Sequence, residues 1–147
     1  MEKVDMGRFS YKKVRKHSSQ MSSEEKKKLR SMFSKVKNWE ILDHVNNRIV
    51  EKNYKITVDD FIDIMKNGEI VEYEQKLYTE SNKMAHLVVL RSVRDRDGVH
   101  DRPHLVFDMT DGKIVTIWIN NYSDNHNSLD MGIYSKGLKV GENYWLD

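Results

Sequence analysis

His44 and Arg48 form a pair of residues whose types and spacing could do chemistry. They lie four residues apart in a stretch with helical periodicity, so they share one face of the expected helix. A neutral imidazole beside a permanent cation suits acid–base chemistry on a phosphodiester, because the cation can hold a phosphate oxygen. The alternative interpretation is a histidine at the margin of the core and a surface arginine near Asp43 or Glu51.

A second candidate surface lies on a predicted hairpin over residues 102–121. Two alternating strands flank a three-residue loop that ends in Gly112, and left-handed backbone at this glycine pairs Phe107 with Val115. One face of the hairpin is then wholly apolar. The opposite face carries His104, Thr116, Trp118 and Asn120. This polar face is either a site for chemistry or an ordinary solvated sheet surface.

Several familiar catalytic and metal-binding motifs are absent from the sequence. The chain has no cysteine, and its six histidines show neither HxH nor HExxH spacing, so no metal site is expected. Neither a glycine-rich phosphate loop nor a GxSxG motif occurs. The aspartates around Gly98 are arranged partly as in a calcium loop, but the glycine is misplaced and no glutamate closes the set. We therefore expect a function that needs neither metal nor cofactor.

The composition is that of a soluble globular domain with a basic N-terminal end. The 147 residues fit one domain, with 38% hydrophobic and 33% charged residues. No run is apolar enough to span a bilayer and no signal peptide is visible, so a cytoplasmic location is the simplest expectation. Ten lysines and arginines crowd the first 30 residues, although the formal net charge is only +2. This favours an anionic partner, and a solubilising tail is the alternative.

The elements that must position these residues follow an α+β order. Residues 1–21 show no clear period and are expected to form a basic arm, which is flexible or becomes ordered only against the rest of the domain or a partner. Residues 22–147 are expected to form a single domain. Helices are predicted after the capping residues Ser22 and Thr57 and over residues 39–49. Strand patterns follow over residues 69–78, 84–93 and 102–121. We predict N-terminal helices packed on one face of a four-stranded, or slightly larger, antiparallel meander.

The segment from Asp43 to Glu74, DHVNNRIVEKNYKITVDDFIDIMKNGEIVEYE, and the later strand KIVTIW resemble a family of small bacterial and phage domains. That family has a helical His…Arg motif, a threonine-capped helix followed by glycine, and a strand with Thr-x-aromatic. It is similar to the barnase–EndoU–colicin–RelE group of metal-independent ribonucleases and their toxin relatives. The resemblance covers roughly residues 39–121, and Trp118 stands where the family usually shows a smaller aromatic residue.

The resemblance implies an endoribonuclease that cleaves RNA by attack of the ribose 2′-hydroxyl on the neighbouring phosphorus. Matched position by position, it points to His44 as acid or base, Arg48 for the phosphate and Thr116 as oxyanion donor, and it says little about His126. Our hypothesis adds His126 or His104 as the second proton carrier. We also expect RNA binding by Arg91, Arg94, His104, Trp118 and Asn120, with the ring of Trp118 as a stacking surface. A cognate inhibitor would be a further partner of such a toxin.

The competing prediction is a non-catalytic phage or bacterial interaction protein that uses the same fold to bind a host protein or a nucleic acid. The sequence contains no close His/Lys/Glu catalytic set, and this favours the non-catalytic class. Domains of this shape also occur as inactive binding modules, so the shape alone does not separate the two functions.

Overall fold

The computed structural model describes residues 11–93, 101–121, 134–135 and 137–144. In this part of the chain it contains three α-helices and one six-stranded mixed sheet, which is the expected α+β class. The helices are α1 (Ser23–Ser34), α2 (Asp43–Glu51) and α3 (Val58–Asn67), and a 3-10 turn spans Ser18–Gln20. The strands are β1 (Tyr11–His17), β2 (Glu40–Ile41), β3 (Glu69–Tyr78), β4 (Lys83–Arg91), β5 (Asp101–Asp108) and β6 (Lys113–Asn121).

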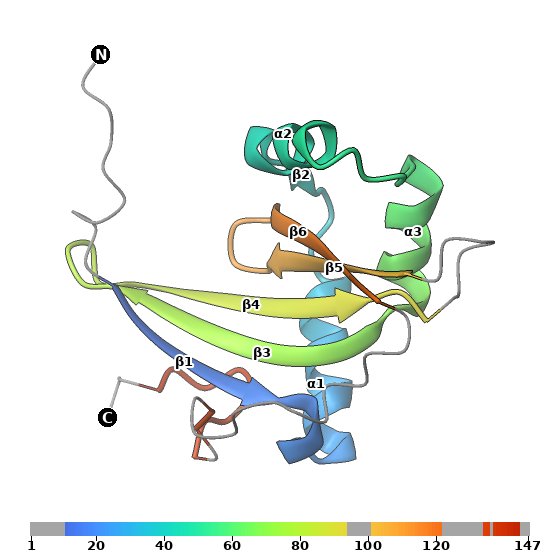
Figure 1. Ribbon diagram of the computed structural model, residues 1–147. Coiled ribbons are helices and arrows are strands. Elements are labelled where there is room, and N and C mark those ends of the chain that lie inside the picture. Colours follow the sequence, from blue (N-terminus) through green and yellow to red (C-terminus); the bar gives the residue numbers. More distant parts are fainter. Residues whose placement is uncertain (1–10, 94–100, 122–133, 136, 145–147) are drawn as a thin grey trace.

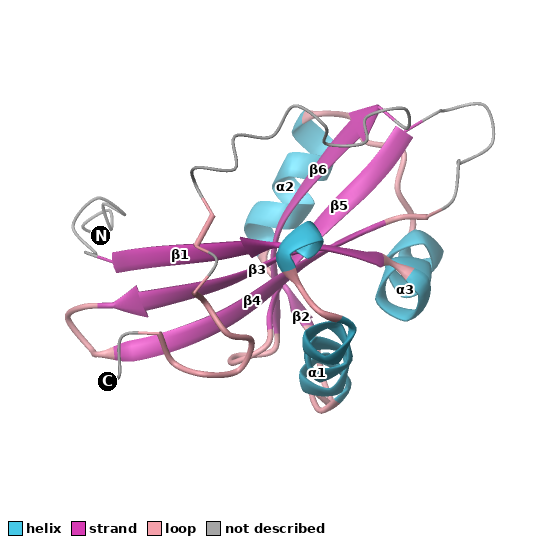
Figure 2. Cartoon of the chain, turned by 90° about the horizontal axis from the view of Figure 1, so that it is seen from below, coloured by secondary structure: helices cyan, strands magenta, loops and turns pink. Residues whose placement is uncertain are grey.

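The sheet has the strand order β1-β3-β4-β5-β6-β2. Strands β3, β4, β5 and β6 pair antiparallel with their neighbours, and β2 pairs parallel with β6. The sequence predicted a sheet of four or slightly more strands that was antiparallel throughout, whereas the sheet has six strands and is mixed because β2 is parallel to β6. Figure 1 shows α1 behind β3 and β4, and Figure 2 shows the strong twist that turns β6 steeply away from the direction of β1.

Strand β1 lies within the stretch that was predicted to be a flexible arm. Residues 11–17 pair antiparallel with β3, so this part of the arm is ordered against the rest of the domain, and residues 1–10 lie outside the described residues. Cross-strand charges explain the pairing, because Arg15 faces Glu74 and His17 faces Glu72 in register. The strand was missed because its alternation is mostly between charged side chains.

Local capping signals were read correctly from the sequence. Ser22 and Thr57 both form capping boxes, the first with Glu25 and the second with Asp60. The helix predicted over residues 39–49 begins only at Asp43, because residues 40–41 form β2 and bind the backbone of β6 instead. Backbone amides of residues 40 and 42 donate to the carbonyls of residues 112 and 114, so this contact with a distant strand overrides the helical pattern.

The hairpin of β5 and β6 differs from its predicted register by one β-bulge. Gly112 is left-handed (φ 70°), as predicted, and Leu105 pairs with Ile117. A register shift between Val106 and Phe107 pairs Phe107 with Ile114 rather than with Val115. The bulge leaves an extra residue on β6 and moves Val115 to the face that carries Val106.

Buried apolar side chains of the sheet belong to two clusters, and in the described chain helix residues belong to one of them. The larger core cluster joins Leu29 of α1, Val45 of α2 and Ile64 of α3 to residues of the strands such as Leu105 and Ile117. We call this side the helix-covered face. The second cluster contains strand residues alone in the described chain: Val71, Ala85, Leu87, Val89 and Val106. We call this side the open face.

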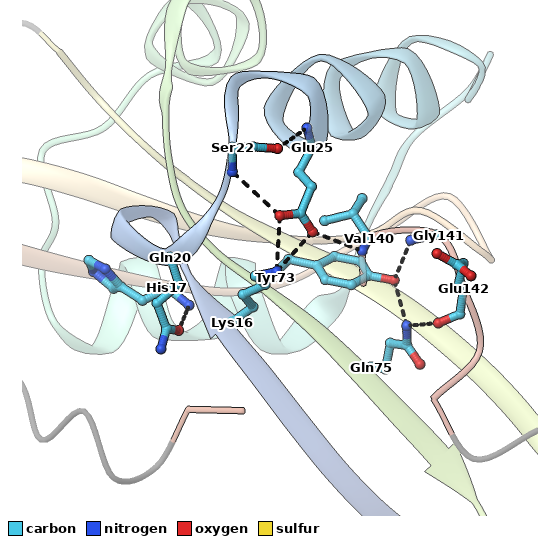
Figure 3. A network of polar contacts seen from close by, with 10 residues as sticks. All are labelled: Lys16, His17, Gln20, Ser22, Glu25, Tyr73, Gln75, Val140, Gly141 and Glu142. Atoms are coloured by element: carbon cyan, nitrogen blue, oxygen red, sulfur yellow. Dashed lines mark hydrogen bonds and ion pairs between the residues drawn. The ribbon is translucent and has the colours of Figure 1, made fainter. Parts of the chain in front are cut away.

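The C-terminal segment is fastened to the helix-covered face by the buried hydroxyl of Tyr73 (Figure 3). This oxygen accepts from Gly141 N (3.1 Å) and Gln75 Nε2 (2.9 Å). Its own proton is therefore directed to Nδ1 of His86, which leaves Nε2 of His86 to donate to Asn143 Oδ1 (2.9 Å). Burial raises the pKa of Tyr73 to about 12, so the hydroxyl keeps its proton.

Tyr73→Phe is expected to lower the free energy of unfolding by about 1–3 kcal/mol, because the buried amide of Gln75 and the polar groups of Gly141 and His86 lose a hydrogen-bond partner. Urea unfolding followed by circular dichroism measures the change. Tyr78→Phe is the control, since the structure gives its hydroxyl no hydrogen bond, and it should change stability by less than about 0.5 kcal/mol. Equal effects of the two substitutions would contradict this account of the C-terminal segment.

Candidate nucleic-acid interface

Three predicted RNA-binding residues form one row across the open face. Arg91 of β4 pairs with His104 of β5, and His104 pairs with Trp118 of β6. Directly paired residues of an antiparallel sheet point to the same side, so the three side chains lie together. The rings of His104 and Trp118 stack with centroids 4.9 Å apart and planes 22° apart.

His104 supports the Trp118 ring and does not itself offer a contact surface. It is 0% exposed, and its Nδ1 lies 2.9 Å from the carbonyl oxygen of Arg102. A carbonyl only accepts hydrogen bonds, so Nδ1 carries the proton and the imidazole is held in one orientation. The predicted direct contact of His104 with RNA stays a prediction, and in this structure the buried imidazole stacks on the indole of Trp118.

Trp118 and Thr116 also line a groove of about 510 Å³ on the open face. Its floor is apolar and comes from the cluster of Val71, Leu87, Val89 and Val106. A bulge in β3 at Val71 and the bulge in β6 at Val115 add one apolar side chain to each side of this floor. The groove therefore combines the flat indole of Trp118 with an apolar floor, and such a surface suits a planar aromatic ring of a ligand.

The opposite rim of the groove carries charges that are already paired with one another. Lys13 Nζ lies 3.0 Å from Glu74 Oε1, and Arg15 Nε lies 3.8 Å from Glu72 Oε2. Tyr134 Oη donates to Glu72 Oε1 at 3.2 Å. Burial and the neighbouring Glu72 carboxylate raise the pKa of Tyr134 to about 12. Lys76 also lines the groove, and no ion pair is given for it within the described residues. Two of the three cations of the groove are therefore paired with carboxylates.

Guanidinium groups gather beside the aromatic row, at the end of the sheet where β3 begins. The Arg91 guanidinium forms an ion pair with Glu69, and Arg102 Nη2 lies 4.0 Å from the same carboxylate. Arg102 Nε also donates to the carbonyl oxygen of Ser92 (3.0 Å). The Nη1 atom of Arg91 is buried without a hydrogen-bond partner. A stacking surface and cations therefore occupy adjacent strands.

The predicted catalytic residues are not gathered in the same way. His44 is exposed on α2, and the neighbouring Val45 packs into the cluster of the helix-covered face. Thr116 lines the groove of the open face, and neither His44 nor Arg48 lines that groove. Among the described residues, no hydrogen bond joins Thr116 to either of them. Arg48 is half-buried, with its Nε buried and without a hydrogen-bond partner.

Some predicted site residues cannot be placed. His126 and Arg94 lie outside the described residues, as does the side chain of Asn120, whose backbone pairs with Arg102. The sequence interpretation in turn missed the residues around the groove rim and the corner of the sheet: Arg15, Glu69, Glu72, Arg102 and Tyr134. Alternation of glutamate with apolar residues in β3 was visible, but its cationic partners on β1 came from a stretch predicted to be an arm.

Comparisons with known proteins add no further constraint. No family model matches the chain, and no curated protein or solved structure was found to match it. Among the described residues, no group of three or more histidine and carboxylate side chains could hold a metal ion. No helix in that part of the chain has the length and apolar character needed to cross a membrane.

Glu72→Gln is expected to remove a pH dependence of stability. Burial raises the pKa of Glu72 above 4.5, although Arg15 partly opposes the shift. The folded state holds this proton more tightly than the unfolded chain does. The contribution of the protonated Glu72 carboxyl to the free energy of unfolding is therefore complete at low pH and is lost as the pH rises through the folded pKa. The free energy of unfolding of the wild type should therefore fall relative to Glu72→Gln as the pH rises above about 4.5.

Urea titrations at a series of pH values measure this difference. Glu51→Gln, at an exposed position of α2, is the matched control and should follow the wild-type profile. A wild-type profile that stays parallel to that of Glu72→Gln at every pH would contradict the assignment.

Proposed function

We propose that this chain binds single-stranded RNA through its open face and acts as a non-catalytic recognition domain. The observation that carries the proposal is the row of Arg91, His104 and Trp118, in which an indole ring is seated on a buried imidazole beside guanidinium groups. Unpaired bases are recognised by stacking on aromatic side chains, and cations neutralise the phosphates between them.

The dimensions of the open face support a nucleotide ligand. Arg91 and Trp118 lie two strands apart, a separation of roughly 10 Å at the usual strand spacing. A base stacked on Trp118 over the apolar floor would leave its phosphates on the side of Arg91 and Arg102. At the other end of the groove, Lys13 and Arg15 are already paired with Glu74 and Glu72, so these two cations are less available to phosphates.

RNA cleavage by transesterification is the second candidate function. Its support is the resemblance to metal-independent ribonucleases and the position of Thr116, which lines the groove two residues from Trp118. The chemistry also needs a proton carrier near the reacting phosphate. His44 lies on an element that packs on the helix-covered face, and this is why recognition without cleavage is the first choice.

Trp118→Ala is expected to weaken binding of a short single-stranded RNA by about 5- to 150-fold, because stacking of one base contributes about 1–3 kcal/mol. Fluorescence anisotropy with a labelled 12-nucleotide RNA measures the affinity. Trp118→Phe should recover most of the loss, since it keeps an aromatic face. Tyr11→Ala, an exposed aromatic residue at the far end of the sheet, is the control and should bind like the wild type.

Purified protein incubated with total RNA and EDTA is expected to leave the RNA intact, and expression of the chain should not arrest cell growth. Gel analysis of the RNA over time is the measurement. Cleavage in EDTA that slows by about 10²–10⁴-fold in His44→Ala would instead establish the nuclease, because removal of one general acid or base has an effect of this size.

A further inference from the structure

A second hollow, of about 500 Å³, lies where α1 meets the start of β3. Lys26, Lys27 and Arg30 of α1 line one side of it, and Asn67, Gly68 and Glu69 line the other. Lys26 and Arg30 are four residues apart on the helix, so they project from the same face. These α1 residues were noted in the sequence only as part of a basic run.

Arg30 is fixed in place at this hollow. Its Nη2 donates to the carbonyl oxygen of Gly68, which follows the last turn of α3. Gly68 is required there, because a Cβ atom would lie 2.3 Å from the carbonyl oxygen of Ile64. Burial lowers the pKa of Arg30 from its ordinary value, but the guanidinium keeps its charge near neutral pH. The hollow therefore contains one anchored cation flanked by two exposed lysines.

Among the described residues, cations outnumber the carboxylates that could neutralise them. Glu69 is the one carboxylate in this part of the chain that lines the hollow, and it is already shared by Arg91 and Arg102. A second carboxylate, Asp63, accepts a hydrogen bond from Asn67 (3.0 Å). The structure gives no ion pair for Lys26 or Lys27 within the described residues. We name the five cations around Glu69 the cationic corner: Lys26, Lys27, Arg30, Arg91 and Arg102.

We infer that the cationic corner is a binding site for backbone phosphates, so that an RNA strand runs from the Trp118 groove past Arg91 and Arg102 onto the lysines of α1. The inference rests on the proposed function and adds the direction of the strand to it. Arg91 connects the two parts, because it belongs to the aromatic row on one side and pairs with Glu69 of the hollow on the other. The corner offers no aromatic side chain, so this contact does not depend on base sequence.

The test is the salt dependence of binding of a labelled 12-nucleotide RNA, measured by anisotropy at several KCl concentrations. Each phosphate contact contributes about 0.7 to the slope of log K against log [salt] for a single strand. The slope of Lys26→Gln/Lys27→Gln should therefore be smaller than that of the wild type by about 1.4. Both lysines are exposed, so the double variant should fold normally.

A matched variant separates a specific site from a general loss of charge. Lys12→Gln/Lys52→Gln removes the same net charge from exposed positions on β1 and at the end of α2, and it should keep the wild-type slope. Equal slopes for the two double variants overturn the phosphate site.

Trp118→Ala distinguishes failure of this inference from failure of the proposed function. Weaker binding by Trp118→Ala with an unchanged slope in the α1 variant rejects the cationic corner and keeps the open face. A reduced slope in the α1 variant with unchanged binding by Trp118→Ala keeps the phosphate site and rejects the groove. Absence of RNA binding by the wild type rejects both.

Discussion

Strands β4 and β5 carry apolar side chains on both faces, whereas the helices cover one face in the described chain. Leu90, Leu105 and Ile117 pack with residues of all three helices, and Val89 and Val106 belong to a second cluster built from strands alone. An apolar sheet face loses free energy when it stays exposed to water. The open face reduces that exposure by curving, through two bulges, so that its own side chains form the walls of a groove.

The exposure of an apolar sheet face to water also explains the positions of the polar side chains around the groove. Lys13 and Arg15 of β1 cover the apolar floor with their stems and pair with Glu74 and Glu72 at its rim. On the other side, His104 is sealed beneath Trp118. Among the described residues, the groove therefore has an aromatic side chain at one end and mostly paired charges at the other, and further cations lie at the corner of the sheet.

The helix-covered face shows how distant segments complete the core. Tyr73 lies between the sheet and the C-terminal segment, and its hydroxyl accepts two hydrogen bonds and donates a third. Lys16 of β1 bonds to Glu25 of α1 at 2.9 Å, and the same carboxylate accepts from Val140 N at 3.4 Å. These contacts close the part of this face where Leu138 and Val140 are buried in the core cluster.

Sequence by itself determined the features that depend on neighbouring residues. The capping boxes at Ser22 and Thr57 form within three residues, and Gly112 takes the left-handed backbone that a glycine permits. The bounds of β3 also followed from its alternation.

Tertiary structure alone decided the pairing of β1, the burial of His104, the placement of α2 away from the groove that Thr116 lines, and the convergence of cations on Glu69. These features depend on contacts between residues far apart in the chain, such as Arg30 with Gly68 and Tyr73 with Gly141, which are 38 and 68 positions apart. Local periodicity carries no information about which of the distant segments will meet.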